Sequence, residues 1–132
     1  MFNLIEFESH GDDRGSLISI EEIKSIPFNI KRVYFLFDTK REVVRGLHAH
    51  KNLSQVLICL SGSFKLTLDN GKKRDSKVLK SPNIGVLIES YIWREMTDFS
   101  EDCVILVIAN ENYDENDYIR NYDDFLSHSC SK

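Results

Sequence analysis

Two histidines separated by a single residue offer the clearest chemistry in this chain. His48 and His50 flank Ala49 ahead of a continuous apolar run, a context typical of a β-strand. Side chains two positions apart on a strand point to the same face, with Cα atoms about 6.5–7 Å apart. An imidazole has an ordinary pKa of about 6.5, so either ring can accept or donate a proton near neutral pH. The pair predicts acid–base catalysis, and the alternative is one core histidine beside one exposed histidine.

The surrounding residues resemble the metal-binding motif of cupins with one ligand replaced. Metal cupins carry a His-x-His pair, an acidic residue a few positions on, and a glycine that turns the hairpin. Here Gln55 stands at the acidic position and Gly62 at the turn. A neutral amide is a poor replacement for a carboxylate ligand, and residues 81–93, which would supply another histidine, contain none. We therefore expect no metal and no cofactor, with a metal-dependent cupin oxygenase as the alternative.

Four further side chains could bind or orient a substrate. Tyr34 lies among apolar residues, where its phenol could relay a proton or stabilise an oxyanion. Arg14, in a loop bracketed by glycines, and Arg45, just before the histidines, could hold a phosphate with their guanidinium forks. Trp93 could stack on a base or a sugar. The alternatives are core packing for the two aromatic residues and a solvated surface charge for each arginine.

The hydrophobic pattern predicts an all-β fold. Short apolar or alternating segments separated by turn residues indicate strands at 4–7, 16–20, 32–37, 47–50, 56–60, 64–69, 77–79, 85–88 and 104–109. Asn70-Gly71 is the strongest hairpin signal. Helical spacing occurs near the end, where Ile119, Tyr122 and Leu126 predict a short helix. We expect a cupin-type jelly-roll β-barrel with a short C-terminal helix, in a single domain spanning residues 1–132.

The composition argues against several classes of protein. The chain has 132 residues, 42% of them hydrophobic, which fits a soluble globular domain. Its formal net charge is -4 and its longest basic run is Lys72 to Arg74, so we expect no nucleic-acid partner. The N-terminal segment does not resemble a signal peptide, and no apolar run is long enough to cross a bilayer, so we expect no membrane partner. Cys59, Cys103 and Cys130 are odd in number and widely spaced, which predicts no disulfides and a cytoplasmic location.

Nearly the whole chain resembles the sugar-nucleotide 3,4-ketoisomerases, also called WxcM-like proteins. The most specific blocks are Arg45-Gly46-Leu47-His48-Ala49-His50-Lys51 and the segment from Tyr113 to Arg120. The resemblance continues through the segments Pro27 to Tyr34, Gln55 to Cys59, Leu68 to Gly71 and Trp93 to Met96. It implies a metal-free cupin that moves the keto group of dTDP-4-keto-6-deoxyglucose from C4 to C3 through an enediol(ate), in deoxyamino-sugar biosynthesis. It also implies a homodimer that exchanges N-terminal strands.

The resemblance also assigns roles to individual residues. His48 becomes the catalytic base, and His50, Tyr34 and Arg14 match other active-site positions of the family. Arg94 stands where relatives often carry histidine, so specificity could differ if its side chain reaches the substrate. The residues expected to bind substrate are Arg14, Arg45, Gln55, Trp93 and Arg94. A non-catalytic sugar-nucleotide-binding module is the alternative, and the sequence leaves the gluco or galacto configuration at C4 open.

Overall fold

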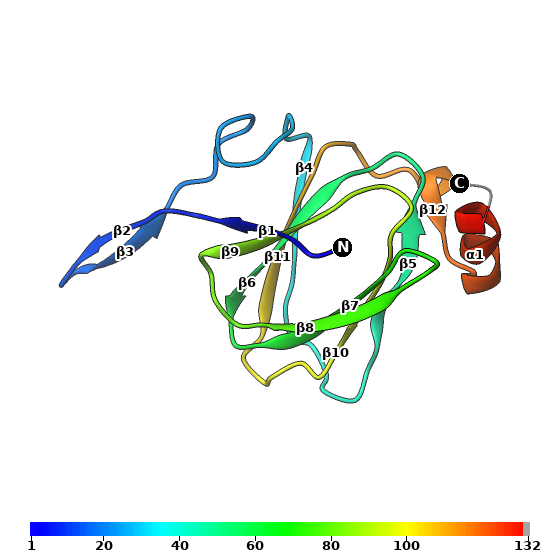
Figure 1. Cartoon of the computed structure of the whole chain (residues 1–132). Helices are drawn as coiled ribbons and strands as arrows, with labels where there is room; N and C mark the ends of the chain where they lie inside the picture. The colour runs from blue at the N-terminus through cyan, green and yellow to red at the C-terminus, as the bar shows by residue number, and fades with distance from the viewer. Residues whose placement is uncertain (131–132) are drawn as a thin grey trace.

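Two five-stranded antiparallel sheets form the body of the protein (Figure 1). The computed structural model describes residues 1–130. The first sheet contains, in spatial order, β1 (Asn3–Glu6), β9 (Ile84–Ile88), β6 (Gln55–Ser61), β11 (Val104–Ala109) and β4 (Arg32–Leu36). The second contains β12 (Tyr118–Ile119), β5 (Arg45–His50), β10 (Trp93–Thr97), β7 (Phe64–Asp69) and β8 (Arg74–Leu79).

Apolar side chains from both sheets meet in the main core. On β7 they alternate as the sequence predicts, with Phe64, Leu66 and Leu68 fully buried. Strand β6 is buried on both faces, because Leu57 faces this core while Val56 packs in a second cluster. That second cluster lies on the outer side of the first sheet, where residues of the N-terminal thirty cover it. The strand that carries Gln55 is thus enclosed from both sides.

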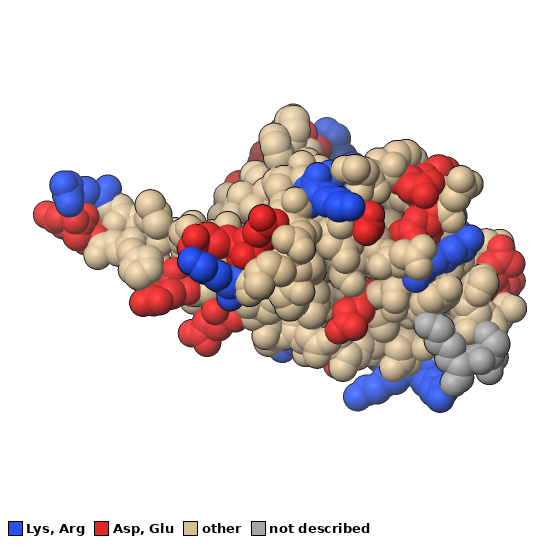
Figure 2. Space-filling view, turned by 90° about the horizontal axis from the view of Figure 1, so that it is seen from above, with Lys and Arg blue, Asp and Glu red and all other residues tan. Residues whose placement is uncertain are grey.

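Two smaller elements lie outside the sheets. Strands β2 (Ser9–Asp12) and β3 (Gly15–Ile18) form a hairpin that projects from the body (Figure 1). Charged side chains of both signs gather at its tip (Figure 2). After β11 the chain forms a short 3-10 helix, η1 (Glu115–Asp117), then β12 and helix α1 (Tyr122–Cys130). Helix α1 lies against the outside of the second sheet beside β12 and β5 (Figure 1).

The expected all-β architecture with a short C-terminal helix is confirmed, with three differences in detail. The sequence pattern did not predict β2, which is polar and exposed, or β10, whose alternating residues include a buried arginine. Ile119 is part of β12 and pairs with Ala49, so the helix begins later than its spacing suggested. The hairpin at Asn70-Gly71 is present between β7 and β8.

Other expectations concern cysteines and membranes. Cys59 and Cys103 are free and buried, as expected. The side chain of Cys130 and residues 131–132 lie outside the described part of the chain. Within residues 1–130, no helix has the length and apolar character needed to cross a membrane.

Candidate active site

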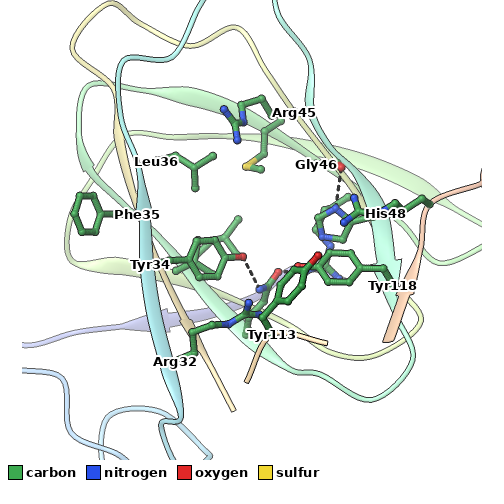
Figure 3. A pocket seen from close by; sticks show the side chains of 15 residues that line it. Arg32, Tyr34, Phe35, Leu36, Arg45, Gly46, His48, Tyr113 and Tyr118 are labelled. Atoms are coloured by element: carbon green, nitrogen blue, oxygen red, sulfur yellow. Dashed lines mark hydrogen bonds between the residues drawn. The ribbon is translucent and has the colours of Figure 1, made fainter. Parts of the chain in front are cut away.

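A pocket opens between the two sheets beside the histidine strand β5 (Figure 3). It has a volume of about 420 Å³, and β4, β5, β6, β10, β11 and the segment 113–120 line it. None of its lining residues is acidic, whereas four are arginines: Arg32, Arg45, Arg94 and Arg120. A cleft lined by one sign of charge attracts the opposite sign. The pocket therefore favours an anionic ligand.

A β-bulge in β5 sets the direction of the first histidine. Gly46 and Leu47 have positive φ angles of 88° and 49°. The register with β10 shifts at this point, so that Glu95 faces Gly46 while Arg94 faces His48. A side chain at Gly46 would meet the carbonyl oxygen of Arg94 at 3.0 Å, so both the space and the φ angle favour glycine. The bulge brings the Gly46 carbonyl oxygen to 2.8 Å from His48 Nδ1.

His48 lines the pocket and keeps its Nε2 unprotonated. A carbonyl oxygen can only accept a hydrogen bond, so Nδ1 carries the proton and Nε2 the lone pair. Nε2 is buried and has no hydrogen-bond partner among the described residues. Burial, followed by the charge of Arg94, lowers the pKa of His48 to about 3. The ring is therefore neutral at pH 7 and can accept a proton.

His50 lies behind His48 and does not line the pocket. The two rings meet edge to face, with centroids 4.8 Å apart. Nδ1 of His50 lies 3.0 Å from Oδ2 of Asp117, so this ring also carries its proton on Nδ1. Burial, followed by Arg94, lowers the pKa of His50. The Asp117 carboxylate acts in the opposite direction, because an adjacent negative charge favours the protonated ring.

Gln55 joins two other pocket residues. Its Nε2 donates a hydrogen bond to the Tyr34 hydroxyl at 3.2 Å, and its Oε1 accepts one from Arg94 Nη1. A carboxylate could accept from the guanidinium but could not donate to the phenol, so glutamine suits this position. Burial raises the pKa of Tyr34, which keeps the phenol protonated. Its hydroxyl proton is therefore free to bind an oxygen of a ligand.

Arg94 carries its charge inside the protein, with only 1% of the residue exposed. Besides Gln55, it donates to the Ile92 carbonyl oxygen at 2.9 Å, and its buried Nε has no partner. Among residues 1–130 no carboxylate lies within ion-pair distance of it. Burial lowers the pKa of Arg94 to about 10, so the group stays charged at neutral pH. A buried cation without a counter-ion is costly, which indicates that an anion binds beside it.

Arginines and aromatic rings form another wall of the pocket. The guanidinium of Arg32 lies 5.0 Å from the ring centroid of Tyr34 and 5.7 Å from that of Tyr113. Nε and Nη2 of Arg32 are buried without partners in the described structure. Arg120 lies over the ring of Tyr118, 4.2 Å from its centroid. Nε and Nη2 of Arg120 donate to the Glu115 carboxylate, whereas those of Arg32 remain available for a ligand. Guanidinium N–H groups beside aromatic faces suit a phosphate attached to a planar base.

Five of the eight site residues predicted from the sequence come together here. Tyr34, Arg45, His48, Gln55 and Arg94 line the pocket. His50 supports it from behind, as described above.

Trp93 is not part of the pocket. It is buried on the other face of β10, where it packs against Tyr122 and Phe125 of α1. Successive strand residues point to opposite faces, so Arg94 faces the pocket because Trp93 faces the helix. Core packing, the alternative considered from the sequence, describes Trp93 better than substrate binding.

Arg14 lies far from the pocket of its own chain. It follows β2 at the tip of the projecting hairpin, and its side chain is 87% exposed and paired with Asp12 at 2.7 Å. It does not line the pocket. A substrate-binding role for Arg14 therefore requires a second copy of the chain.

Sequence reasoning assigned no role to several lining residues, namely Arg32, Tyr113, Tyr118 and Arg120. For Arg32 a signal was available, because it stands two positions before Tyr34 on one strand and so shares its face. The other three lie in a segment that reaches β5 only through the pairing of Tyr118 with His50. Strand pairing over that distance along the chain is not visible in local patterns.

The described residues also bear on metal binding. Among residues 1–130, no group of three or more His, Cys, Asp or Glu side chains is arranged to hold a metal ion. Independence of the reaction from metal stays a prediction.

Comparison with known proteins identifies the family. Residues 1–129 match the FdtA family, described as WxcM-like, C-terminal. The chain belongs to this family. A TDP-4-oxo-6-deoxy-alpha-D-glucose-3,4-oxoisomerase from Aneurinibacillus thermoaerophilus is 54% identical over 122 residues, which cover 92% of this chain and 88% of the relative.

Solved structures of WxcM-like proteins agree closely with this fold. A variant of the 3,4-ketoisomerase QdtA from Thermoanaerobacterium thermosaccharolyticum, in complex with TDP-4-keto-6-deoxyglucose, is 44% identical with a TM-score of 0.97. The match covers 99% of this chain and 95% of that one. A 3,4-ketoisomerase from Helicobacter canadensis is 46% identical with a TM-score of 0.95, covering 98% and 97% of the two chains.

The neutral, half-buried His48 of this WxcM-like protein makes its stability depend on pH. The pKa of His48 is about 3 in the folded protein and about 6.5 in an unfolded chain. Between these values the unfolded state binds one more proton, so the free energy of unfolding falls as the pH is lowered, by up to about 1.4 kcal/mol per pH unit. Urea unfolding between about pH 5 and pH 6, where most carboxylates stay ionised, should show this slope reduced in His48→Asn. Equal slopes in the two proteins would mean that His48 takes up protons freely in the folded state.

Proposed function

We propose that this WxcM-like protein is a TDP-4-keto-6-deoxyglucose 3,4-ketoisomerase. The observation that carries the proposal is the free Nε2 of His48 in a pocket lined by arginines. Relatives described as 3,4-oxoisomerase and 3,4-ketoisomerase support the substrate class, and one of them was solved with TDP-4-keto-6-deoxyglucose. We assign catalysis to His48, His50 and Tyr34, and substrate binding to Arg45, Gln55 and Arg94.

His48 acts as the base in this proposal. The carbonyl at C4 of the sugar acidifies the hydrogen at C3. His48 Nε2 accepts this proton, and the electrons of the C3–H bond form an enediolate between C3 and C4. Protonation of the C4 carbon, with transfer of the hydroxyl proton from the C3 oxygen to the C4 oxygen, leaves the ketone at C3. The negative charges of the diphosphate and the enediolate offset the effect of Arg94, so the bound substrate raises the proton affinity of His48 above that in the free enzyme.

Tyr34 and Arg94 stabilise the enediolate. The phenol donates its free proton to a substrate oxygen, because Gln55 donates to the phenol oxygen and does not compete for that proton. Arg94 supplies positive charge without further desolvation, because its guanidinium is already buried. Preorganised charge in a dry site stabilises a developing anion more strongly than water does.

The remaining arginines bind the diphosphate. Arg45 lines the pocket, and Arg32 and Arg120 line the wall that carries the aromatic rings. Each diphosphate oxygen can accept charge-assisted hydrogen bonds from a guanidinium fork. The rings of Tyr113 and Tyr118 provide flat apolar surface beside these arginines, which suits the thymine base.

The experiment that tests this function follows the C3 hydrogen by NMR in deuterated solvent. The wild-type protein should incorporate deuterium at C3 of the remaining 4-keto sugar and form the 3-keto product, which carries deuterium at C4. His48→Asn should keep its affinity for TDP and lose C3 exchange, with a rate lower by about 10²–10⁴-fold, the contribution typical of a general base. His128→Asn, the same change at an exposed site on α1, is the matched control and should behave as wild type.

Three outcomes separate the alternatives. Binding of TDP with no conversion of the 4-keto sugar by wild-type protein would support a non-catalytic binding module. If His48→Asn exchanged the C3 hydrogen with solvent at the wild-type rate, His48 would not be the base. The NMR assignment of the product also establishes the configuration at C4.

Turnover should not depend on a metal ion. The two histidines lack an acidic partner at position 55, where the Gln55 oxygen is already bound to Arg94. Dialysis against a strong chelator should leave kcat unchanged. A loss of activity that a single divalent cation restores would contradict metal-free acid–base catalysis and favour a metal-dependent cupin.

The active form in this proposal is a homodimer with exchanged N-terminal segments, acting in the cytoplasm. The β2–β3 hairpin projects from its own chain and exposes Leu17 (61%). Strand β4 is an edge strand that exposes Val33 (54%) and Phe35 (60%). Exposed apolar surface on an unpaired strand and on a projecting hairpin favours association of two copies. Arg14, at the hairpin tip, then reaches the diphosphate in the partner's pocket.

Arg14 can be tested by mixing two impaired variants. Arg14→Ala should raise KM more than it lowers kcat, because the contact with the diphosphate is equal in the ground and transition states. If Arg14 acts across the dimer, refolding Arg14→Ala together with His48→Asn creates heterodimers with one native site. An equal mixture should then recover about a quarter of the wild-type activity at wild-type KM, since half the dimers carry one native site of two. No recovery on mixing, in dimers shown to exchange subunits, would exclude a role in the partner's site.

A further inference from the structure

A buried carboxylate stands behind the two histidines, in a position that the reaction outlined above does not use. Asp117, the last residue of η1, has a side chain only 11% exposed. Its Oδ2 lies 3.0 Å from His50 Nδ1, and its Oδ1 accepts from the backbone N–H of Asn52 at 2.7 Å. The backbone N–H of Leu53 points to Oδ2 at 3.3 Å. Three donors therefore fix this carboxylate in place.

The strand arrangement holds Asp117 rigidly against His50. The backbone N–H of Lys51 donates to the Asp117 carbonyl oxygen at 2.9 Å, directly after His50 in β5. Tyr118, the next residue, pairs with His50 in the register of β12 and β5. Asp117 thus lies directly before β12, beside the end of β5. Its side chain cannot turn away without breaking three hydrogen bonds, one of which is the bond to the buried His50 ring.

We propose that Asp117 is a positioning residue that holds His50 in the Nδ1–H tautomer and stabilises its protonated form. This inference rests on the proposed isomerase function. The lone pair on His50 Nε2, which is buried and unpartnered in the described structure, is then always available as a proton acceptor. In this role His50 takes over the proton that His48 accepts from C3, which leaves His48 neutral, and returns a proton for C4 through His48, the histidine that lines the pocket.

The charges around His50 make the aspartate necessary for this role. Arg94, Arg32 and Arg120 all disfavour a positive charge on the ring, as does its burial. Asp117 is the carboxylate in hydrogen-bond contact with His50. Its negative charge offsets the arginines at the stage when His50 holds the proton. His48, whose Nδ1 faces only the neutral Gly46 carbonyl, has no such compensation. The two histidines therefore differ in how well they retain a proton.

The first test needs no substrate. Nitrogen-15 NMR of the wild-type protein distinguishes the two neutral tautomers of each histidine, and His50→Asn assigns the His50 signals. We expect His50 with its proton on Nδ1 at neutral pH. A proton on Nε2 would overturn the proposal, whether or not the protein isomerises the sugar. Failure of the wild-type protein to convert the sugar would instead count against the proposed function.

The second test compares variants by kcat and KM. Asp117→Asn removes the negative charge but keeps a similar shape, so kcat should fall by about 10²-fold, the lower range for positioned acid–base groups, with KM nearly unchanged. The matched control is Asp114→Asn, at the exposed N-cap of η1, because asparagine caps equally well. This control should keep wild-type rates.

The double variant decides whether Asp117 acts through His50. If it does, adding Asp117→Asn to His50→Asn should cause no further loss, because the partner is already gone. If the fold-loss in kcat of the double variant equals the product of the two single losses, Asp117 acts independently of His50, through the Asn52 and Leu53 backbone. That result would overturn the proposal. Should Asp117→Asn fail to fold, the tautomer of His50 in the wild-type protein still supports or refutes the role.

Discussion

The burial of one guanidinium without a carboxylate partner is the constraint on which this site depends. Arg94 reaches the pocket from β10, and the structure satisfies it with the neutral oxygens of Gln55 and Ile92. Burial is the largest cause of the lowered pKa of both histidines, and the charge of Arg94 is the second. The arginine therefore keeps the bases neutral, fixes the amide that orients Tyr34, and leaves the site with a positive charge that only a ligand can neutralise. A neutral residue at position 94 would relax all three conditions together.

Local patterns in the sequence were sufficient for much of the site. Residues two positions apart on a strand face the same side, and this rule directed His48 toward the space between the sheets. The same rule could not tell that His50 lies deeper than His48. That depth depends on Asp117, 67 residues along the chain, and on the pairing of Tyr118 with His50. For Arg14, the turn was recognisable, but the direction in which a projecting hairpin points is a property of the assembled protein.

The fold was predictable wherever apolar periodicity was strong. Strands such as β7 and β6 follow their hydrophobic pattern, and the Asn70-Gly71 turn forms where expected. Strand β10 was missed because both of its faces are buried and one carries an arginine, a combination that resembles neither a core strand nor an amphipathic one. The segment before α1 misled in the opposite way, since Ile119 has helical spacing to later residues yet pairs with β5. In both cases a specific tertiary contact outweighed the local pattern.

The position of Trp93 makes it an intrinsic fluorescent probe. It is the single tryptophan of the chain, and its indole N–H donates to Glu95 at 3.0 Å while its ring packs against Tyr122 and Phe125. Its emission therefore depends on the seating of α1 against the sheet, and the adjacent backbone is that of Arg94. Because a peptide bond joins the two, a displacement of β10 when the pocket fills is transmitted to the indole on the opposite face. Intrinsic fluorescence can thus follow events in the pocket from outside it, without a label.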